Sequence, residues 1–166
     1  MINNFNYKIV VFLMGVLLLV NGGFMLLSSL ISLFSNDGFV EKITISSLIV
    51  ISAGFVFLFF GRGYEKQIQK REGYLIVTLG WILMSITGTI PYIMTGVIPQ
   101  FSSSFFESMS GYTTTGATII EKIDSLPKGI LFWRSTTHWI GGMGIIVLAI
   151  AILPFLGIGG TQLFSA

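Results

Sequence analysis

Cysteine is absent from this chain of 166 residues, and charged residues make up only 10% of it. Without cysteine, the sequence can form no disulfide, no zinc–thiolate site and no cysteine nucleophile. It has one histidine, and its carboxylates are not spaced with a catalytic base or a metal-binding pair, so we expect no enzymatic activity. The formal net charge of +2 is small and the basic residues are scattered, which argues against nucleic acid as a partner.

Apolar residues are abundant instead. They make up 53% of the chain and give a mean hydropathy of +0.88, more than a soluble domain of this size can bury in its own core. A membrane-spanning helix needs about 20 mainly apolar residues, and the chain contains several runs of this kind. We therefore expect an all-α integral membrane protein with spans over residues 9–33, 43–60, 74–94 and 133–156.

The densest basic stretch lies between the second and third runs, where segment 62–73 holds Arg62, Lys66, Lys70 and Arg71. Cytoplasmic loops of membrane proteins carry an excess of lysine and arginine. We interpret this charge as a topology signal in preference to a specific lipid site. It places the loop and both ends of this chain in the cytoplasm.

Between Pro99 and Pro127 the chain is too polar to span a membrane and too apolar at its start for an exposed loop. Residues 101–111 predict a short helix that stops at Gly111. Irregular backbone at membrane depth is tolerated only where protein buries it or where it lines a watery cavity, so the segment predicts a pore. Glu107 in this helix either attracts cations to the outer mouth or makes local hydrogen bonds, and the sequence favours neither reading.

The residues after this helix are suited to binding a dehydrated cation. Extended backbone presents successive carbonyl oxygens, and rings of such oxygens replace the hydration shell of an ion such as potassium. Gly116 lacks a Cβ and can reach backbone angles that turn carbonyls toward one axis, while the threonine hydroxyls add ligands or brace the strand. The candidate ion-binding residues are Thr113, Thr114, Thr115, Gly116, Ala117 and Thr118.

Aromatic and charged residues near the start of the last run predict a membrane interface. Trp133 and Trp139 fit an outer interfacial belt. Arg134 is expected to anchor the same interface or, alternatively, to pair with a carboxylate of the outer loop, Glu121 or Asp124.

Small and polar residues inside the apolar runs predict close helix packing. Gly141, Gly142 and Gly144 follow no strand and have no accompanying lysine, so they are not interpreted as a nucleotide-binding loop. Asn21 in the first run predicts a close helix contact or a kink. His138, the only histidine, is interpreted as a packing or interfacial residue.

Three stretches together carry a resemblance to a known family: FFESMSGYTTTGATII, LPKGILFWRS and WIGGMGIIVLAIAILPFLGIGG. They resemble the first pore repeat of Trk-type potassium uptake transporters of the Trk/Ktr/HKT superfamily. The resemblance is dense from Phe105 onward, and the first two runs are similar to the helical pair that precedes the pore repeats. It implies an N-terminal hairpin over 1–61, a cytoplasmic basic loop over 62–73 and a first pore repeat over 74–166.

Within that repeat the resemblance implies an outer helix over 74–94, a pore helix and filter over 101–118 and an inner helix over 133–156. Potassium is then the transported substrate, held at Thr114 and Thr115 together with Gly116, and no covalently bound cofactor is implied. The implied setting is the bacterial cytoplasmic membrane, and the implied partners are the lipid bilayer, a second copy in a homodimer and a cytosolic nucleotide-binding regulatory ring.

This chain carries a single repeat, whereas family members carry four. We expect it to be the N-terminal part of a longer transporter whose remaining repeats complete the pore. Two alternatives stay open: a homotetrameric channel built from one repeat per chain, and a truncated or non-transporting membrane assembly module.

Overall fold

The computed structural model describes residues 6–64 and 70–152, and every regular element in these ranges is helical. The all-α fold expected from the sequence is therefore confirmed. The elements are α1 (Tyr7–Ser35), α2 (Val40–Phe60), α3 (Lys70–Gly88), α4 (Ile90–Thr95), α5 (Phe101–Tyr112), the 3₁₀ turn η1 (Ile123–Ser125) and α6 (Lys128–Ile152).

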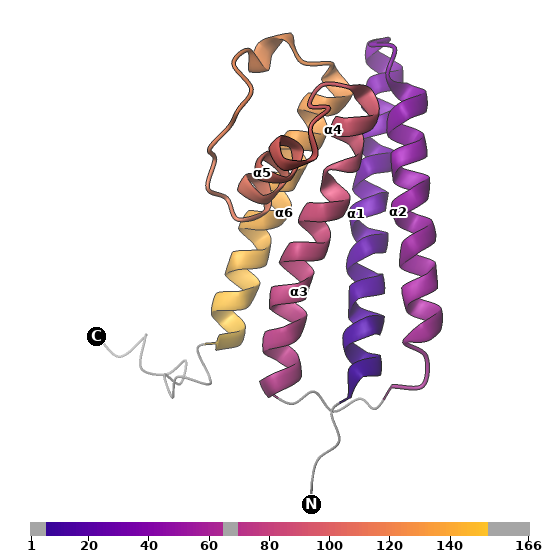
Figure 1. Cartoon of the computed structure of the whole chain (residues 1–166), viewed down its shortest axis with the longest axis vertical. Coiled ribbons are helices and arrows are strands. Elements are labelled where there is room, and N and C mark those ends of the chain that lie inside the picture. Colours follow the sequence, from indigo (N-terminus) through magenta and orange to yellow (C-terminus); the bar gives the residue numbers. More distant parts are fainter. Residues whose placement is uncertain (1–5, 65–69, 153–166) are drawn as a thin grey trace, which may run out of the picture.

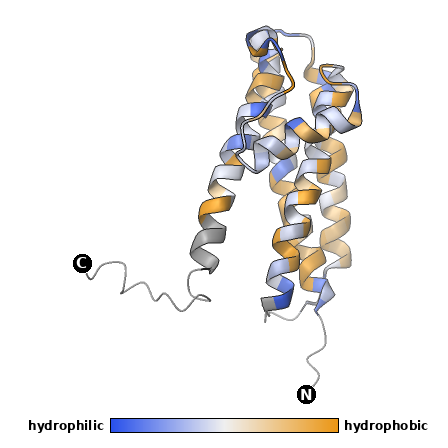
Figure 2. Cartoon of the chain, turned by 60° about the vertical axis from the view of Figure 1, so that its left-hand side comes forward, coloured by the Kyte–Doolittle hydropathy of each residue, from blue (hydrophilic) through white to orange (hydrophobic). Residues whose placement is uncertain are grey.

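Three stretches of the described residues are helical, long and apolar enough to cross a membrane: Tyr7–Ser35, Val40–Phe60 and Arg71–Thr95. α6 runs beside them as the fourth predicted span, and the predicted end of that span, 153–156, lies outside the described residues. Figure 2 shows hydrophobic residues along the length of the helices and hydrophilic ones gathered at the two ends and around α5. This distribution is that of a helical membrane protein.

The long helices stand side by side, and the shorter α5 lies among them at partial height (Figure 1). The α1–α2 turn, α4 and η1 all lie at one end of the bundle, and α1 and α3 begin at the other. α5 packs mainly against α3 and α6. Segment 101–127 therefore enters the bundle and leaves it at the same end.

α1 and α2 form a hairpin held by polar contacts inside its apolar surface. Asn36 ends α1 in a left-handed conformation (φ 49°), which reverses the chain. The Ser29 and Thr44 hydroxyls lie 2.5 Å apart, and the Ser47 hydroxyl donates to the Gly22 carbonyl at 2.8 Å. Because lipid is as apolar as leucine, contacts of this kind and close packing hold helices together in a membrane.

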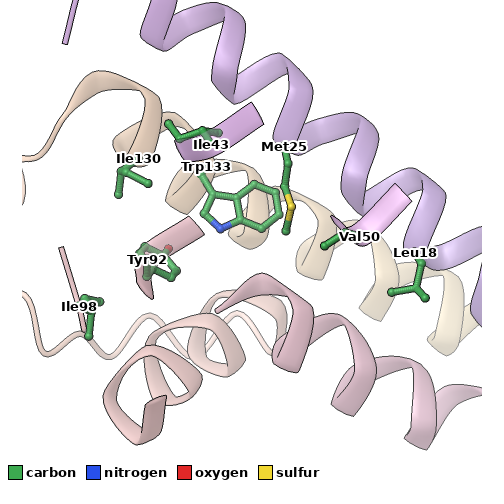
Figure 3. Packing of buried hydrophobic residues seen from close by; sticks show 8 residues of the cluster. All are labelled: Leu18, Met25, Ile43, Val50, Tyr92, Ile98, Ile130 and Trp133. Carbon is green, nitrogen blue, oxygen red and sulfur yellow. The ribbon is translucent and has the colours of Figure 1, made fainter. Parts of the chain in front are cut away.

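A buried apolar cluster joins the hairpin to the rest of the bundle (Figure 3). Trp133 lies fully buried in this cluster, and its indole N–H donates to the Gly88 carbonyl at 3.2 Å. The predicted interfacial position is therefore wrong for Trp133, which packs α6 against the end of α3. Trp139 is 56% exposed, so its place in an outer belt stays a prediction. The residues of the buried apolar cluster drawn in Figure 3 are Leu18, Met25, Ile43, Val50, Tyr92, Ile98, Ile130 and Trp133.

The predicted outer helix over 74–94 is interrupted. α3 ends at Gly88, and α4 begins at Ile90 with Pro91 in its first turn. Pro91 lacks an N–H and clashes with the carbonyl four residues before it, that of Thr87, so the helix breaks here. Gly88 is the last residue of α3, and its carbonyl accepts the hydrogen bond from Trp133. At its other end the helix already begins at Lys70, so the last part of the predicted basic loop is helical.

The predicted inner helix also begins earlier than expected. α6 starts at Lys128, and the Leu131 N–H donates to the Pro127 carbonyl at 2.9 Å, which closes the first helical turn. Proline is favoured just before or at the start of a helix because its fixed φ suits that position and its missing N–H is not needed there.

Candidate ion-binding segment

α5 reaches deep into the bundle because its neighbours are small where it touches them. A Cβ on Gly111 would collide with the side chain of Thr137, and a Cβ on Gly141 would collide with the carbonyl of Tyr112. α6 can therefore approach the last turn of α5 only with glycine at these places. The predicted close packing of Gly141 is confirmed, and Gly144 likewise lies against the ring of Trp81.

The C-terminal end of α5 is tied to two long helices by a buried polar chain. The Tyr112 hydroxyl donates to Asn21 Oδ1 at 2.5 Å, and Asn21 Nδ2 donates to Thr87 Oγ1 at 3.0 Å. Asn21 and Tyr112 are at most 2% exposed, so the hydrogen bonds form away from competing water. The contact predicted for Asn21 is a hydrogen-bonded junction of α1, α3 and α5.

Beyond α5 the backbone turns sharply and then runs extended. The N–H groups of the next three residues donate to the last carbonyls of α5, which caps the helix. Thr114 and Gly116 both have positive φ, at 55° and 78°. A threonine in this region is strained, and Gly116 reaches it without the steric cost of a Cβ, as the sequence led us to expect.

One flank of the extended segment is hydrogen-bonded to α5. The Ser110 hydroxyl donates to the Ala117 carbonyl at 2.6 Å. The Thr118 hydroxyl lies 2.9 and 3.1 Å from the two oxygens of Glu107, and the Ile119 N–H donates to the same carboxylate at 3.1 Å. α5 thus holds the start of the segment through its capping hydrogen bonds and the end of the segment through Ser110 and Glu107.

The carboxylate that makes these contacts is itself buried and ion-paired. Glu107 is 1% exposed, and Arg134 Nε of α6 donates to it at 2.8 Å. The alternative considered for Arg134, an ion pair with Glu121 or Asp124, is therefore wrong. Arg134, Thr118 and Ile119 all donate hydrogen bonds to the Glu107 carboxylate. In this structure Glu107 therefore joins α6, α5 and the segment that follows α5.

The opposite flank of the segment is open. Residues 114–119 are all exposed, whereas the helix beside them is largely buried. In the described part of the chain, no hydrogen bond is recorded to the carbonyl oxygens of Thr114, Thr115 or Gly116. The segment therefore keeps a row of carbonyl oxygens available to a ligand, which is the chemistry that a dehydrated cation requires.

The threonine hydroxyls act mainly on the segment itself. Thr113 Oγ1 donates to the Met109 carbonyl at 2.8 Å and lies 2.8 Å from Thr115 Oγ1. Thr114 Oγ1 donates to the Thr113 carbonyl at 2.7 Å. Of the two roles expected for the hydroxyls, these contacts correspond to bracing the backbone.

Sequence reasoning did not identify the contacts that hold the segment from other elements. Asn21, Ser110 and Arg134 make contacts with partners on other elements, and only Asn21 and Arg134 had a signal, as polar residues beside or within apolar runs. Their partners could not be chosen from the sequence, because the Tyr112–Asn21 bond joins positions 91 residues apart.

A short helix enters the helical bundle, ends partway and leads into a braced extended segment whose carbonyls have no partner among the described residues. This is the architecture of membrane transport proteins with a re-entrant pore segment. The family profile described as "TrkH: Cation transport protein" matches residues 40–166. The chain belongs to this family of cation transport proteins.

Relatives with known names agree with this family. The chain is 40% identical over 162 residues to the Trk system potassium uptake protein TrkH of Salmonella typhimurium, covering 97% of this chain and 34% of the relative. It is 45% identical over 101 residues to TrkG of Escherichia coli, covering 60% of this chain and 21% of that protein.

A solved structure is similar along almost the whole chain. The crystal structure of the potassium transporter TrkH from Vibrio parahaemolyticus matches with a TM-score of 0.86 and 39% identity, covering 94% of this chain and 34% of that one. The chain thus spans about a third of the length of the relatives that it matches.

Proposed function

We propose that this chain contributes one wall of a potassium uptake pathway, in which the segment Thr113–Thr118 is the ion-binding filter. The observation that carries the proposal is the asymmetry of this segment: α5 and Glu107 hold one flank, while the carbonyl oxygens of Thr114, Thr115 and Gly116 have no partner within the described chain. Potassium is the ion because the named relatives are potassium uptake proteins.

The pathway needs further walls, because the open flank of the segment has no cover in the described part of this chain. We infer that three further pore segments face it around one axis, supplied by the rest of a longer polypeptide or by other chains. In this arrangement α3 with α4 is the outer helix, α5 the pore helix and α6 the inner helix of one repeat. The hairpin α1–α2 stands outside the repeat and supports it.

The end of the bundle where α1 and α3 begin is proposed to face the cytoplasm of a bacterium. Lys8 and Arg71 are in the first turns of α1 and α3, and Arg62 follows the end of α2. Cytoplasmic ends of membrane helices carry an excess of lysine and arginine. The filter then opens toward the outer face. The proposed partners are the bilayer, a second copy in a homodimer and a cytosolic nucleotide-binding ring at the basic end.

The test uses the complete natural protein in bacterial cells that lack other potassium uptake, with rubidium as the tracer ion. Gly116→Ala introduces a Cβ where φ is 78°, so the backbone must move and the carbonyls lose their alignment. We expect rubidium uptake to fall at least about tenfold, which corresponds to a loss of about 1.4 kcal/mol in the free energy of ion binding. Selectivity for rubidium over sodium should decrease as well.

Gly38→Ala is the matched control. Gly38 also has a positive φ, of 82°, and open space around its Cα, but it lies in the turn between α1 and α2, outside both the filter and the proposed partner-binding end. Both variants carry the same local strain, so membrane abundance should change equally. Equal uptake by the two variants would contradict the filter assignment.

A further inference from the structure

The side chain of Tyr112, the last residue of α5, is held by three other helices. Its hydroxyl donates to Asn21 Oδ1 of α1 at 2.5 Å. Its ring packs against α3, where a Cβ on Gly88 would lie 3.0 Å from the ring carbon Cε2. Its carbonyl packs against α6, where a Cβ on Gly141 would lie 2.3 Å from the carbonyl oxygen. Tyr112 is therefore fixed at its backbone, along its ring and at its hydroxyl.

The amide of Asn21 can satisfy its neighbours in one orientation only. Thr87 Oγ1 donates its proton to a carbonyl of its own helix, that of Leu83 at 2.9 Å, so toward Asn21 it can only accept. Asn21 Nδ2 donates to Thr87 Oγ1 at 3.0 Å, which turns Oδ1 toward the Tyr112 hydroxyl. The α1–α2 hairpin thus presents a fixed acceptor to the end of α5, at a completely buried position.

The candidate filter begins at the residue after Tyr112, so its position depends on that of Tyr112. The N–H groups of Thr113, Thr114 and Thr115 donate to carbonyls of the last turn of α5 at 2.9, 2.9 and 3.0 Å. Thr114 has a φ of 55°, and a threonine keeps such a strained conformation only where its surroundings fix it. If Tyr112 is released, Thr114 can relax, and the carbonyl oxygens that follow it move. Cation selectivity depends on the positions and number of these oxygens.

We propose that Asn21 is a positioning residue for ion selectivity: it holds the Tyr112 hydroxyl, and through the end of α5 it fixes the carbonyl oxygens of the candidate filter. The inference rests on the proposed function of Thr113–Thr118. Asn21 lies in the hairpin outside the pore repeat, whereas α5 packs mainly against α3 and α6. The hairpin therefore acts on the filter through a specific side-chain link. A bond that only held helices together would affect stability and leave selectivity unchanged.

Two single variants and their combination test this link in the complete natural protein, in cells that lack other potassium uptake. Tyr112→Phe removes the hydroxyl and keeps the ring, and Asn21→Leu replaces the amide with an apolar side chain of similar size. We expect each variant to lower the ratio of rubidium to sodium uptake about fivefold, which corresponds to about 1 kcal/mol, the typical contribution of one hydrogen bond. The double variant should show the same ratio as either single variant, because all three lack the same bond.

Ser47→Ala is the matched control within the same hairpin. The Ser47 side chain is completely buried and donates to the Gly22 carbonyl at 2.8 Å, and among the described residues no hydrogen bond from it to α5 is recorded. Ser47→Ala should lower the unfolding temperature in detergent without changing the ratio of rubidium to sodium uptake.

Gly116→Ala, measured alongside, separates this inference from the filter assignment, because it introduces a Cβ into the filter itself. If Gly116→Ala lowers the ratio and either Tyr112→Phe or Asn21→Leu does not, this inference fails and the filter assignment stands. An unchanged ratio in Gly116→Ala would overturn both. Additive effects in the double variant, or an equal effect of Ser47→Ala, would show that the bond between Asn21 and Tyr112 does not set selectivity.

Discussion

Glu107 shows how a single buried charge can organise this site. An isolated carboxylate buried to this degree would be costly, and here Arg134 compensates its charge at 2.8 Å while Thr118 and Ile119 occupy its remaining acceptor positions. The pair gives little net stability relative to an apolar replacement. Its value lies in geometry, since it fixes the end of the candidate filter to both α5 and α6.

Glu107→Gln should therefore be strongly disruptive. It leaves the Arg134 guanidinium without its counter-ion, and loss of one partner of a buried pair costs about 3–5 kcal/mol. We expect a lower unfolding temperature in detergent together with reduced discrimination of potassium against sodium in uptake assays.

Glu121→Gln serves as the control, because Glu121 is an exposed carboxylate in the loop that follows the segment. The double variant Glu107→Gln/Arg134→Met should lose less stability than the sum of its single variants, because it leaves no buried charge without a partner. If Glu107→Gln behaved like Glu121→Gln, the bracing role of Glu107 would be excluded.

At the scale of elements, Asp37 connects the α1–α2 turn to the start of α6. Its Oδ2 accepts the Gly129 N–H at 2.9 Å, and its Oδ1 accepts the Phe39 N–H at 3.1 Å and bonds the Ser32 hydroxyl. The carboxylate thus lies at a helix N-terminus, where negative charge is favoured. Burial by itself raises the pKa of Asp37, but these hydrogen bonds outweigh it and lower the pKa below its usual 3.8.

Asp37→Asn should lower the stability of the protein near neutral pH by about 1 kcal/mol, because the amide has a single acceptor oxygen and no charge. Since the folded-state pKa is lowered, the contribution of the carboxylate is complete above the unfolded-state pKa and is lost as the pH falls through the folded-state value. Thermal unfolding in detergent should show a gap between the wild type and Asp37→Asn that closes at acidic pH.

The exposed Asp124 in η1 provides the control, and Asp124→Asn should be neutral across the same pH range. A gap for Asp37→Asn that persisted unchanged into acid would show that its effect does not come from the charge.

The bounds of an element could be predicted where a proline or glycine in the sequence marks its start or end. α5 spans Phe101–Tyr112, where Pro99 before it and Gly111 at its end provided clear signals. The break between α3 and α4 was missed although Pro91 was visible, because apolar residues continue on both sides of it. α6 begins five residues before the predicted span because Pro127 starts the helix, whereas the apolar pattern marks only the part of a helix that lies in the membrane.

The site could be predicted only in part for a related reason. The residues with the chemistry to bind an ion follow one another in the sequence, so Thr113–Thr118 could be identified as a unit. The residues that hold them come from distant positions: Asn21 lies in α1 and Arg134 in α6. One sequence does not show which of several polar residues will meet, and the carboxylates considered as alternative partners of Arg134 did not include Glu107.

At the scale of the whole molecule, the described chain encloses the candidate filter on one side. The hairpin bonds α5 through Asn21 and bonds α6 through Asp37, and the buried cluster packs the helices together. Residues 114–119 are exposed on the opposite side. In Figure 1 the segment accordingly runs along the side of the bundle farthest from α2. The described chain thus covers the candidate filter on one side and leaves its other side exposed.

The most direct measurement is a crystal structure of the complete membrane protein grown in rubidium chloride, with anomalous scattering used to locate the ions. The account predicts rubidium peaks within coordination distance of the carbonyl oxygens of Thr114, Thr115 and Gly116, which disappear when sodium replaces rubidium. Rubidium bound elsewhere in the membrane region, with these carbonyls facing protein or lipid, would contradict the assignment of Thr113–Thr118 as the filter.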